Sequence, residues 1–135
     1  AIQREIGDLA GASGALYVLA RIHARTARYA RARECALESL EICRRTGDRH
    51  GETDDLLTLA HLDRRQARYG RALRTALGVL EAKREMDDRT GEAEALTLIG
   101  RLQGELGRHD AALAHLAEAI RLQRATGDRY GEAET

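Results

Sequence analysis

The segment Thr46-Gly47-Asp48-Arg49-His50-Gly51-Glu52 decides the fold, because close copies of it return along the chain. Residues 86–92 read Met-Asp-Asp-Arg-Thr-Gly-Glu, and residues 126–132 read Thr-Gly-Asp-Arg-Tyr-Gly-Glu. A partial copy, Ile-Gly-Asp, lies at residues 6–8. The aspartates therefore recur every 40 residues, at positions 8, 48, 88 and 128. A fixed period in the range of about 20 to 50 residues indicates a repeat architecture.

Each copy has the features of a boundary between two helices. Gly47 can adopt the left-handed conformation that ends a helix. Asp48 can then cap the N-terminus of the next helix and complement its dipole. Asp87 takes the place of Gly47 in the next copy, so we expect backbone strain there. The later glycine of each copy is predicted to allow close packing against the preceding helix; these glycines are Gly11, Gly51, Gly91 and Gly131.

The composition favours an all-helical protein whose core is built from small and aliphatic residues. Hydrophobic residues make up 43% of the 135 residues and aromatic residues only 3%, so Ala, Leu, Ile and Val must form the core. Proline is absent, which permits long helices. Cys35 and Cys43 lie eight residues apart on one predicted helix, too far apart for a disulfide bond. Because the thiols are expected to be reduced and no secretion signal is visible, we predict a cytoplasmic protein. No apolar stretch reaches about 20 residues, so we expect no membrane span.

Helical spacing of apolar residues places two helices in each 40-residue unit. The first unit is predicted to have helices at about residues 8–26 and 30–45, joined by a short turn at 27–29, and the later units repeat this pattern. Positions 40 residues apart are equivalent in successive units, and we call such a set of positions a column. Two columns of small residues mark where the paired helices should cross closely. These columns are Ala20, Ala60 and Gly100, and Ala32, Ala72 and Ala112.

The third unit resembles a tetratricopeptide repeat. Gly100, Gly107, Ala112 and Ala119 fall where that family places small residues. The usual repeat has about 34 residues, an early Trp and a final Pro, whereas this one has 40, with Leu96 in the Trp column. The longer form is similar to repeats of multidomain bacterial regulators, namely large ATP-dependent transcriptional activators and antibiotic-regulatory proteins, and to repeats of cell-polarity adaptors.

The resemblance implies an all-α, right-handed solenoid of antiparallel helix hairpins in one domain. Three repeats are expected at residues 8–47, 48–87 and 88–127, with partial helices at 1–5 and 129–135. Both ends interrupt a repeat, and no polar capping helix is visible. We therefore expect a segment of a longer protein, whose apolar end surfaces associate end to end.

The resemblance also implies a concave groove lined by the first, or leading, helix of each pair. The column Arg21, His61 and Arg101 lies on that face and is predicted to bind acidic groups of an extended or helical peptide. The full set of predicted partner-binding residues is Tyr17, Arg21, Arg25, Asp54, Leu57, His61, Arg65, Glu94, Thr97 and Arg101. Family members that grip chaperone tails use Lys and Asn in the groove, which these positions do not hold.

Two other functions remain open. The repeats could serve only as a structural module that stacks end to end. Alternatively, the cluster Arg64, Arg65, Arg68, Arg71 and Arg74 could contact nucleic-acid phosphates. Balanced charge, with 22 basic and 22 acidic residues, and the scarcity of aromatic residues make nucleic acid the weaker alternative. No catalytic, cofactor-binding or metal-binding motif is present, so we expect a protein-binding scaffold in a transcriptional regulator and not an enzyme.

Overall fold

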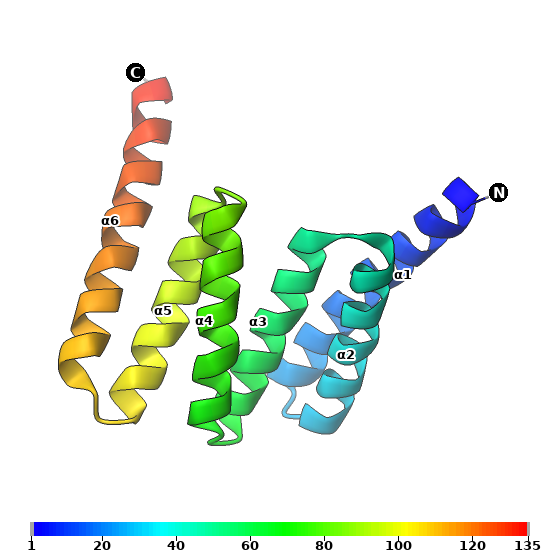
Figure 1. Ribbon diagram of the computed structural model, residues 1–135, viewed down its shortest axis with the longest axis horizontal. Helices are drawn as coiled ribbons and strands as arrows, with labels where there is room; N and C mark the ends of the chain where they lie inside the picture. Colours follow the sequence, from blue (N-terminus) through cyan, green and yellow to red (C-terminus); the bar gives the residue numbers. More distant parts are fainter. Residues whose placement is uncertain (1, 135) are drawn as a thin grey trace. The chain divides into compact units, whose positions relative to one another are not determined.

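The protein folds into helices joined by short turns (Figure 1). The computed structural model describes the backbone of residues 2–134 and the side chains of residues 8–126. Over that part of the chain every regular element is helical, which confirms the predicted all-α class. The helices are α1 (Ile2–Arg25), α2 (Tyr29–Thr46), α3 (Arg49–Arg65), α4 (Tyr69–Glu85), α5 (Arg89–Glu105) and α6 (His109–Glu134).

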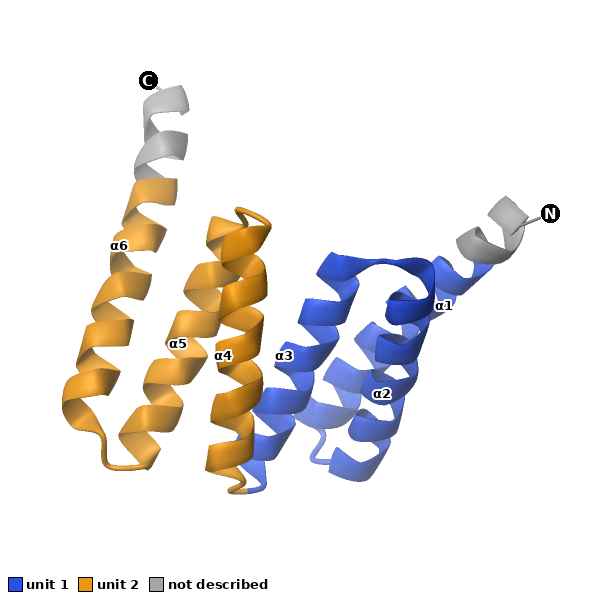
Figure 2. Ribbon diagram, viewed as in Figure 1, with its two compact units in different colours: residues 1–66 blue, residues 67–135 orange. Residues whose placement is uncertain are grey.

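The chain divides into two compact units, residues 1–66 and 67–135 (Figure 2). In the first unit α1 pairs with α2, and α3 packs against both helices. An ion pair also joins α2 to α3, because the guanidinium of Arg33 on α2 lies 2.7 Å from the carboxylate of the buried Asp63 on α3. In the second unit α5 pairs with α6, and α4 packs against α5.

The two internal copies of the repeated segment are helix boundaries, as predicted. At the first hinge, Gly47–Asp48, Gly47 ends α2 at a φ of 72° and Asp48 accepts a hydrogen bond from the backbone N–H of Gly51 at 2.9 Å. At the second hinge, Asp87–Asp88, Asp87 has a φ of 55° and Asp88 accepts from the N–H of Gly91 at 3.0 Å. The predicted strain at Asp87 therefore has a structural basis, because an L-residue disfavours positive φ.

The two outer copies do not break the helices that contain them. Helix α1 runs without interruption through Gly7–Asp8, and α6 runs through Gly127–Asp128, so the prediction of a helix start at Asp8 is wrong. A glycine inside a helix costs only about 1 kcal/mol relative to Ala. A break in a helix leaves backbone hydrogen bonds unformed, which costs free energy. At the internal hinges, the packing of α2 on α3 and of α4 on α5 offsets that cost. Ala1, Thr135, the side chain of Asp128 and the surroundings of Gly131 lie outside the part of the chain that the structure describes.

Small residues in the predicted columns are buried, and in the α1–α2 and α5–α6 hairpins they lie where the paired helices meet. Ala20, Ala32, Ala60 and Ala72 are fully buried. A Cβ atom added at Gly100 would lie 2.6 Å from Cγ of Leu116, so α5 and α6 approach too closely there for any side chain. In the first unit an apolar cluster joins all three helices; its buried members are Ala20, Ala32, Ala36, Leu40, Leu59 and Leu62.

The glycines after each hinge allow close packing at two of the predicted positions. A Cβ atom at Gly51 would lie 2.6 Å from Sγ of Cys43, and one at Gly91 would lie 2.5 Å from Cδ of Lys83. At Gly11 an added Cβ would meet no atom within 4 Å, so the prediction is wrong there. Gly11 lies inside the continuous helix α1, which makes no hinge at that point.

The turns within the helix pairs contain one left-handed residue each. The residues are Ala27 with a φ of 61°, Ala67 with 63° and Gly107 with 80°. Only the third turn places glycine at this position, so the first two turns hold alanine in a strained conformation. Within the part of the chain that the structure describes, no helix combines the length and apolar composition that a membrane crossing requires.

Candidate functional site

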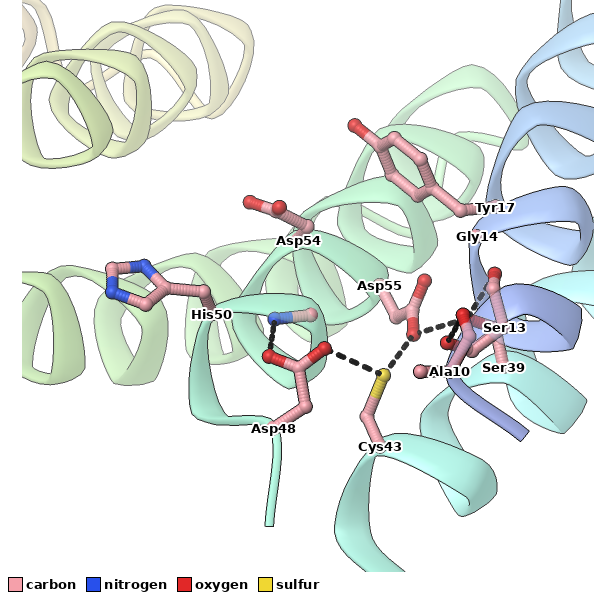
Figure 3. Close-up of a pocket in the computed structure, with 11 residues that line it drawn as sticks. Ala10, Ser13, Gly14, Tyr17, Ser39, Cys43, Asp48, His50, Asp54 and Asp55 are labelled. Atoms are coloured by element: carbon pink, nitrogen blue, oxygen red, sulfur yellow. Dashed lines mark hydrogen bonds between the residues drawn. The ribbon is translucent and has the colours of Figure 1, made fainter. Parts of the chain in front are cut away.

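A polar pocket of about 280 Å³ opens in the first unit between α1, α2 and the start of α3 (Figure 3). The first hinge forms one side of it, because the Asp48 cap fixes where α3 begins. Gly14 leaves room for the opening, because an added Cβ atom there would meet no atom within 4 Å. The lining residues are Ala10, Ser13, Gly14, Tyr17, Ser39, Cys43, Asp48, His50, Gly51, Asp54 and Asp55.

A chain of hydrogen bonds forms the floor of the pocket and links all three helices (Figure 3). Ser39 Oγ lies 3.1 Å from the backbone carbonyl of Ser13 and 2.7 Å from Oδ2 of Asp55. The thiol of Cys43 lies 3.5 Å from the same Asp55 oxygen and 3.9 Å from Oδ2 of Asp48. Ser13, Ser39, Cys43 and Asp55 are buried, so these contacts replace water for the polar groups.

The environment of Asp55 favours its protonated form. Burial away from water raises the pKa of this carboxyl group to about 6, and the nearby charges of Asp54 and Asp48 act in the same direction. Hydrogen bonds from Ser39 and Cys43 lower the pKa but do not cancel the effect of burial. A protonated Asp55 can donate to Ser39, which leaves the single serine proton for the carbonyl of Ser13.

Cys43 is held as a neutral thiol. Its pKa is raised to about 11, chiefly by burial, and the negative charges of the adjacent Asp55 and Asp48 contribute to this rise because they repel a thiolate. A nucleophilic cysteine requires the thiolate form, so Cys43 serves here as a hydrogen-bond donor. Among the residues that the structure describes, no three His, Cys, Asp or Glu side chains are placed to share a metal ion.

Two predicted groove residues, Tyr17 of α1 and Asp54 of α3, line the pocket (Figure 3). Both are half-buried. Arg21 is exposed one turn along α1, and its guanidinium carbon lies 5.7 Å from the centre of the Tyr17 ring, within cation–π distance. The structure thus brings these three residues together on the α1–α3 side of the first unit.

The other predicted groove residues of the first unit have different surroundings. Arg25 and Arg65 are exposed, and Arg65 donates a hydrogen bond to the backbone carbonyl of Ala24 at 3.3 Å, which joins α3 to α1. His61 is half-buried. Leu57 is buried, so it supports the helix packing and offers almost no surface to a partner.

The second unit carries the last three predicted residues on α5. Glu94 and Arg101 are exposed, and Thr97 is half-buried with its hydroxyl group donating to the carbonyl of Ala93 at 2.9 Å. Each therefore lies on the leading helix of its hairpin, as the repeat pattern predicts. Their participation in one binding surface with the first unit stays a prediction.

Comparisons with known proteins agree with this architecture. The tetratricopeptide repeat profile matches residues 13–46 and 93–126, which together make up half of the chain. The chain belongs to the tetratricopeptide repeat family. The two matched segments begin two 40-residue periods apart, which agrees with the repeat spacing. A comparison with curated protein sequences finds no significant match.

A solved tetratricopeptide repeat domain has the same fold. The crystal structure of the TPR domain of Arabidopsis FLU matches with a TM-score of 0.78 and 19% sequence identity. The match covers 85% of this chain and 97% of that one. Identity at this level establishes the fold alone, so the helical-hairpin solenoid class is confirmed and the partner must be argued from the residues.

The floor of the pocket in this tetratricopeptide repeat chain was not predicted from the sequence. Ser39 and Asp55 are polar residue types, which lie mostly in solvent. A signal was present in the repeat columns. Val79 stands 40 residues after Ser39, and Ala95 stands 40 residues after Asp55, and both are fully buried. A polar residue in a column that is elsewhere apolar indicates a buried polar contact.

The alternative basic cluster is divided between the two units. Arg64 and Arg65 belong to the first unit, and Arg68, Arg71 and Arg74 belong to the second. Arg65 is engaged by the α1 backbone, and the three arginines of the second unit are exposed. A nucleic-acid surface built from this cluster stays a prediction.

Proposed function

We propose that this chain is a protein-interaction module that binds a peptide segment of a partner protein on its leading helices. The tetratricopeptide repeat fold supports a protein-interaction scaffold in general. The observation that carries the specific proposal is the pocket of the first unit, whose lining includes Tyr17 and Asp54 and which adjoins the exposed Arg21. We call the surface made by these three residues and Gly14 the leading-helix face.

The chemistry of this face favours a peptide with two kinds of side chain. Arg21 is exposed and lies within cation–π distance of Tyr17, and its planar guanidinium suits a bidentate contact with a partner carboxylate. The pocket itself presents carboxylate groups at Asp48 and Asp54, which accept hydrogen bonds when ionised. A side chain with hydrogen-bond donors therefore fits the pocket, and an acidic residue fits beside Arg21.

We extend the proposal to the columns that continue along the chain. His61 follows Arg21 in the repeat column, and Arg101 follows His61. Each is proposed to contact a further acidic group of the peptide. Leu57 is left out, because it is buried.

The test is peptide selection from a random library displayed against the chain, followed by affinity measurement with the best binder. Arg21→Ala is expected to weaken binding about tenfold, since a hydrogen bond to a charged group contributes about 1.5–3 kcal/mol. Combining it with Arg101→Ala should weaken binding further. Arg31→Ala is the matched control, because Arg31 is an exposed arginine on α2, away from the face.

A second variant probes the pocket without disturbing the fold. A Cβ atom at Gly14 would meet no atom within 4 Å, so Gly14→Leu can be accommodated and would occupy the pocket. We expect helicity and melting temperature to hold or rise, because leucine favours helix more than glycine, while peptide affinity falls. Selected peptides that bind Arg21→Ala and Gly14→Leu as tightly as the natural chain would contradict the proposal.

The proposed setting is the regulatory region of a larger cytoplasmic bacterial regulator of transcription. The support is the 40-residue period, which resembles the repeats of such regulators, and the presence of two free thiols. The encoding open reading frame tests it directly. An ATPase or DNA-binding domain in the same frame is the expected finding, and a secretion signal in that frame would contradict it.

A further inference from the structure

Helix α1 exposes an apolar face whose equivalents are buried elsewhere in the chain. The face consists of Ala15, Val18, Leu19 and Ile22, which recur at the i, i+3, i+4 and i+7 spacing of one helix side. Leu19 is 43% exposed, whereas Leu59, 40 residues later, is 8% exposed and Ile99 is fully buried. We call these four residues the α1 face.

Helix α6 exposes a second such face. It consists of Leu113, Leu116 and Ile120, of which Leu113 and Ile120 are exposed and Leu116 is half-buried. Ile120 is 47% exposed, while its equivalents Leu40 and Leu80 are buried at 5% and 4%. We call these three residues the α6 face.

The two faces correspond to the two halves of an interface that the chain already contains. In the first unit, Ala36 and Leu40 of α2 form one apolar cluster with Leu59 and Leu62 of α3. The α6 face holds Leu116 and Ile120 in the columns of Ala36 and Leu40. The α1 face holds Leu19 and Ile22 in the columns of Leu59 and Leu62. Packing α6 on the α1 of another copy would therefore repeat the α2–α3 contact.

We propose that this chain associates head to tail, with the α6 face of one copy packed on the α1 face of a second copy. The contact joins two different surfaces, so each copy keeps one face available for a further copy. Neither face carries a charged residue, which suits mutual burial and leaves desolvation of apolar surface as the driving force. This contact is separate from the leading-helix face, so it stands or falls independently of peptide binding.

The test is sedimentation or light scattering of the whole chain over a wide range of concentration. The natural chain is expected to increase in average mass with concentration. Leu19→Glu and Ile120→Glu should each hold the mass at the 14.9 kDa of one chain, because a carboxylate in an apolar contact weakens association more than about tenfold. An equimolar mixture of the two variants should form a dimer and nothing larger, because one intact α6 face and one intact α1 face remain to meet.

Controls separate this contact from other kinds of association. Leu37 is 49% exposed on α2, and the equivalent Leu77 is also exposed, so Leu37→Glu should associate like the natural chain. Leu113→Glu offers a second substitution on the α6 face at a highly exposed position, and circular dichroism verifies that each variant is folded. A natural chain that stays monomeric at every concentration would overturn the proposal. Persistent association of either single-face variant would also overturn it, because a symmetric contact or another surface would then be responsible.

Discussion

The first and second hinges share a backbone design but enclose different chemistry. In both, an aspartate caps the following helix through the N–H of a glycine, at 2.9 Å from Asp48 to Gly51 and 3.0 Å from Asp88 to Gly91. An arginine–glutamate pair also joins the flanking helices at both hinges, Arg44 with Glu52 and Arg84 with Glu92.

Beneath this shared frame the buried polar groups differ. The first hinge encloses a hydrogen-bonded network in which the Cys43 thiol and Ser39 meet the buried carboxyl group of Asp55. At the second hinge the buried Lys83 ammonium lies 3.2 Å from the Asp88 carboxylate, and Val79 and Ala95 stand where the first hinge has Ser39 and Asp55. The capping residues therefore determine the backbone conformation of the hinge, while the buried residues next to it can differ between repeats. The first interior forms part of a pocket, while the second holds an ion pair.

The largest expected difference between the hinges is in their dependence on pH. The pKa of Asp55 is about 6 in the folded chain, against an ordinary value of 3.8, so folding favours the protonated carboxyl. Below pH 3.8 both folded and unfolded states are protonated, and the stabilising effect is complete. It is lost as pH rises through 6, and 1.36 kcal/mol per pKa unit gives a loss of about 3 kcal/mol.

Asp55→Asn isolates this contribution, because asparagine imitates the protonated group and does not titrate. The free energy of unfolding of both proteins is measured by urea titration from pH 4 to 8. As pH rises, we expect the value for Asp55→Asn to increase relative to that of the natural chain. The neighbouring Asp48, Asp54 and Cys43 remain in both proteins, so their titration is largely common to the two curves. Parallel curves for the two proteins would contradict a raised pKa for Asp55.

Removing the ammonium from the second hinge should have the next largest effect. Lys83→Met keeps the apolar stem that packs over Gly91 but removes the ammonium group that lies 3.2 Å from the Asp88 carboxylate. Breaking a fully buried pair costs about 3–5 kcal/mol, and Asp88 is partly exposed, so we expect a loss of about 2 kcal/mol in the free energy of unfolding.

Arg84→Met is the matched control, since Arg84 forms exposed ion pairs with Glu92 and Glu118. Surface pairs contribute about 0–1 kcal/mol. Chemical denaturation at neutral pH measures both variants. Equal effects of the two substitutions would show that the buried position of Lys83 adds nothing to its pairing with Asp88.

The smallest expected effect comes from exchanging the residues that hold the left-handed turn. Gly47 and Asp87 occupy the same place at φ values of 72° and 55°. Asp87→Gly should raise the free energy of unfolding by up to about 1 kcal/mol, and Gly47→Asp should lower it by a similar amount. Thermal melts of the two variants are the measurement. Changes of the same sign in both would contradict a role for backbone strain.

Much of the fold could be predicted from the sequence because it depends on local chemistry repeated at a fixed interval. The Gly47–Asp48 boundary follows from the conformational freedom of glycine and the capping preference of aspartate. The helix crossings at Ala20 and Gly100 follow from side-chain size. The continuity of α1 through Gly7–Asp8 could not be predicted in the same way, because packing on both sides decides whether such a pair breaks a helix.

The interior of the candidate site was harder to predict for a related reason. Asp55 and Lys83 are charged residue types, which lie mostly in solvent, and only the neighbouring helices show that each is buried. Leu57 was assigned to the binding surface from its column and is instead part of the packing. By contrast, Tyr17 and Asp54 were predicted to bind a partner because of their positions on the leading helices, and both line the same pocket in the structure.

Amide NMR of the chain titrated with a selected peptide tests the central claim most directly. If the peptide binds the leading-helix face, the largest shifts will fall on Gly14, Tyr17 and Asp54, and Gly14→Leu will abolish them at the same peptide concentration. Shifts confined to α2 or α6, with Gly14, Tyr17 and Asp54 unmoved at saturation, would contradict the claim that this face binds the partner.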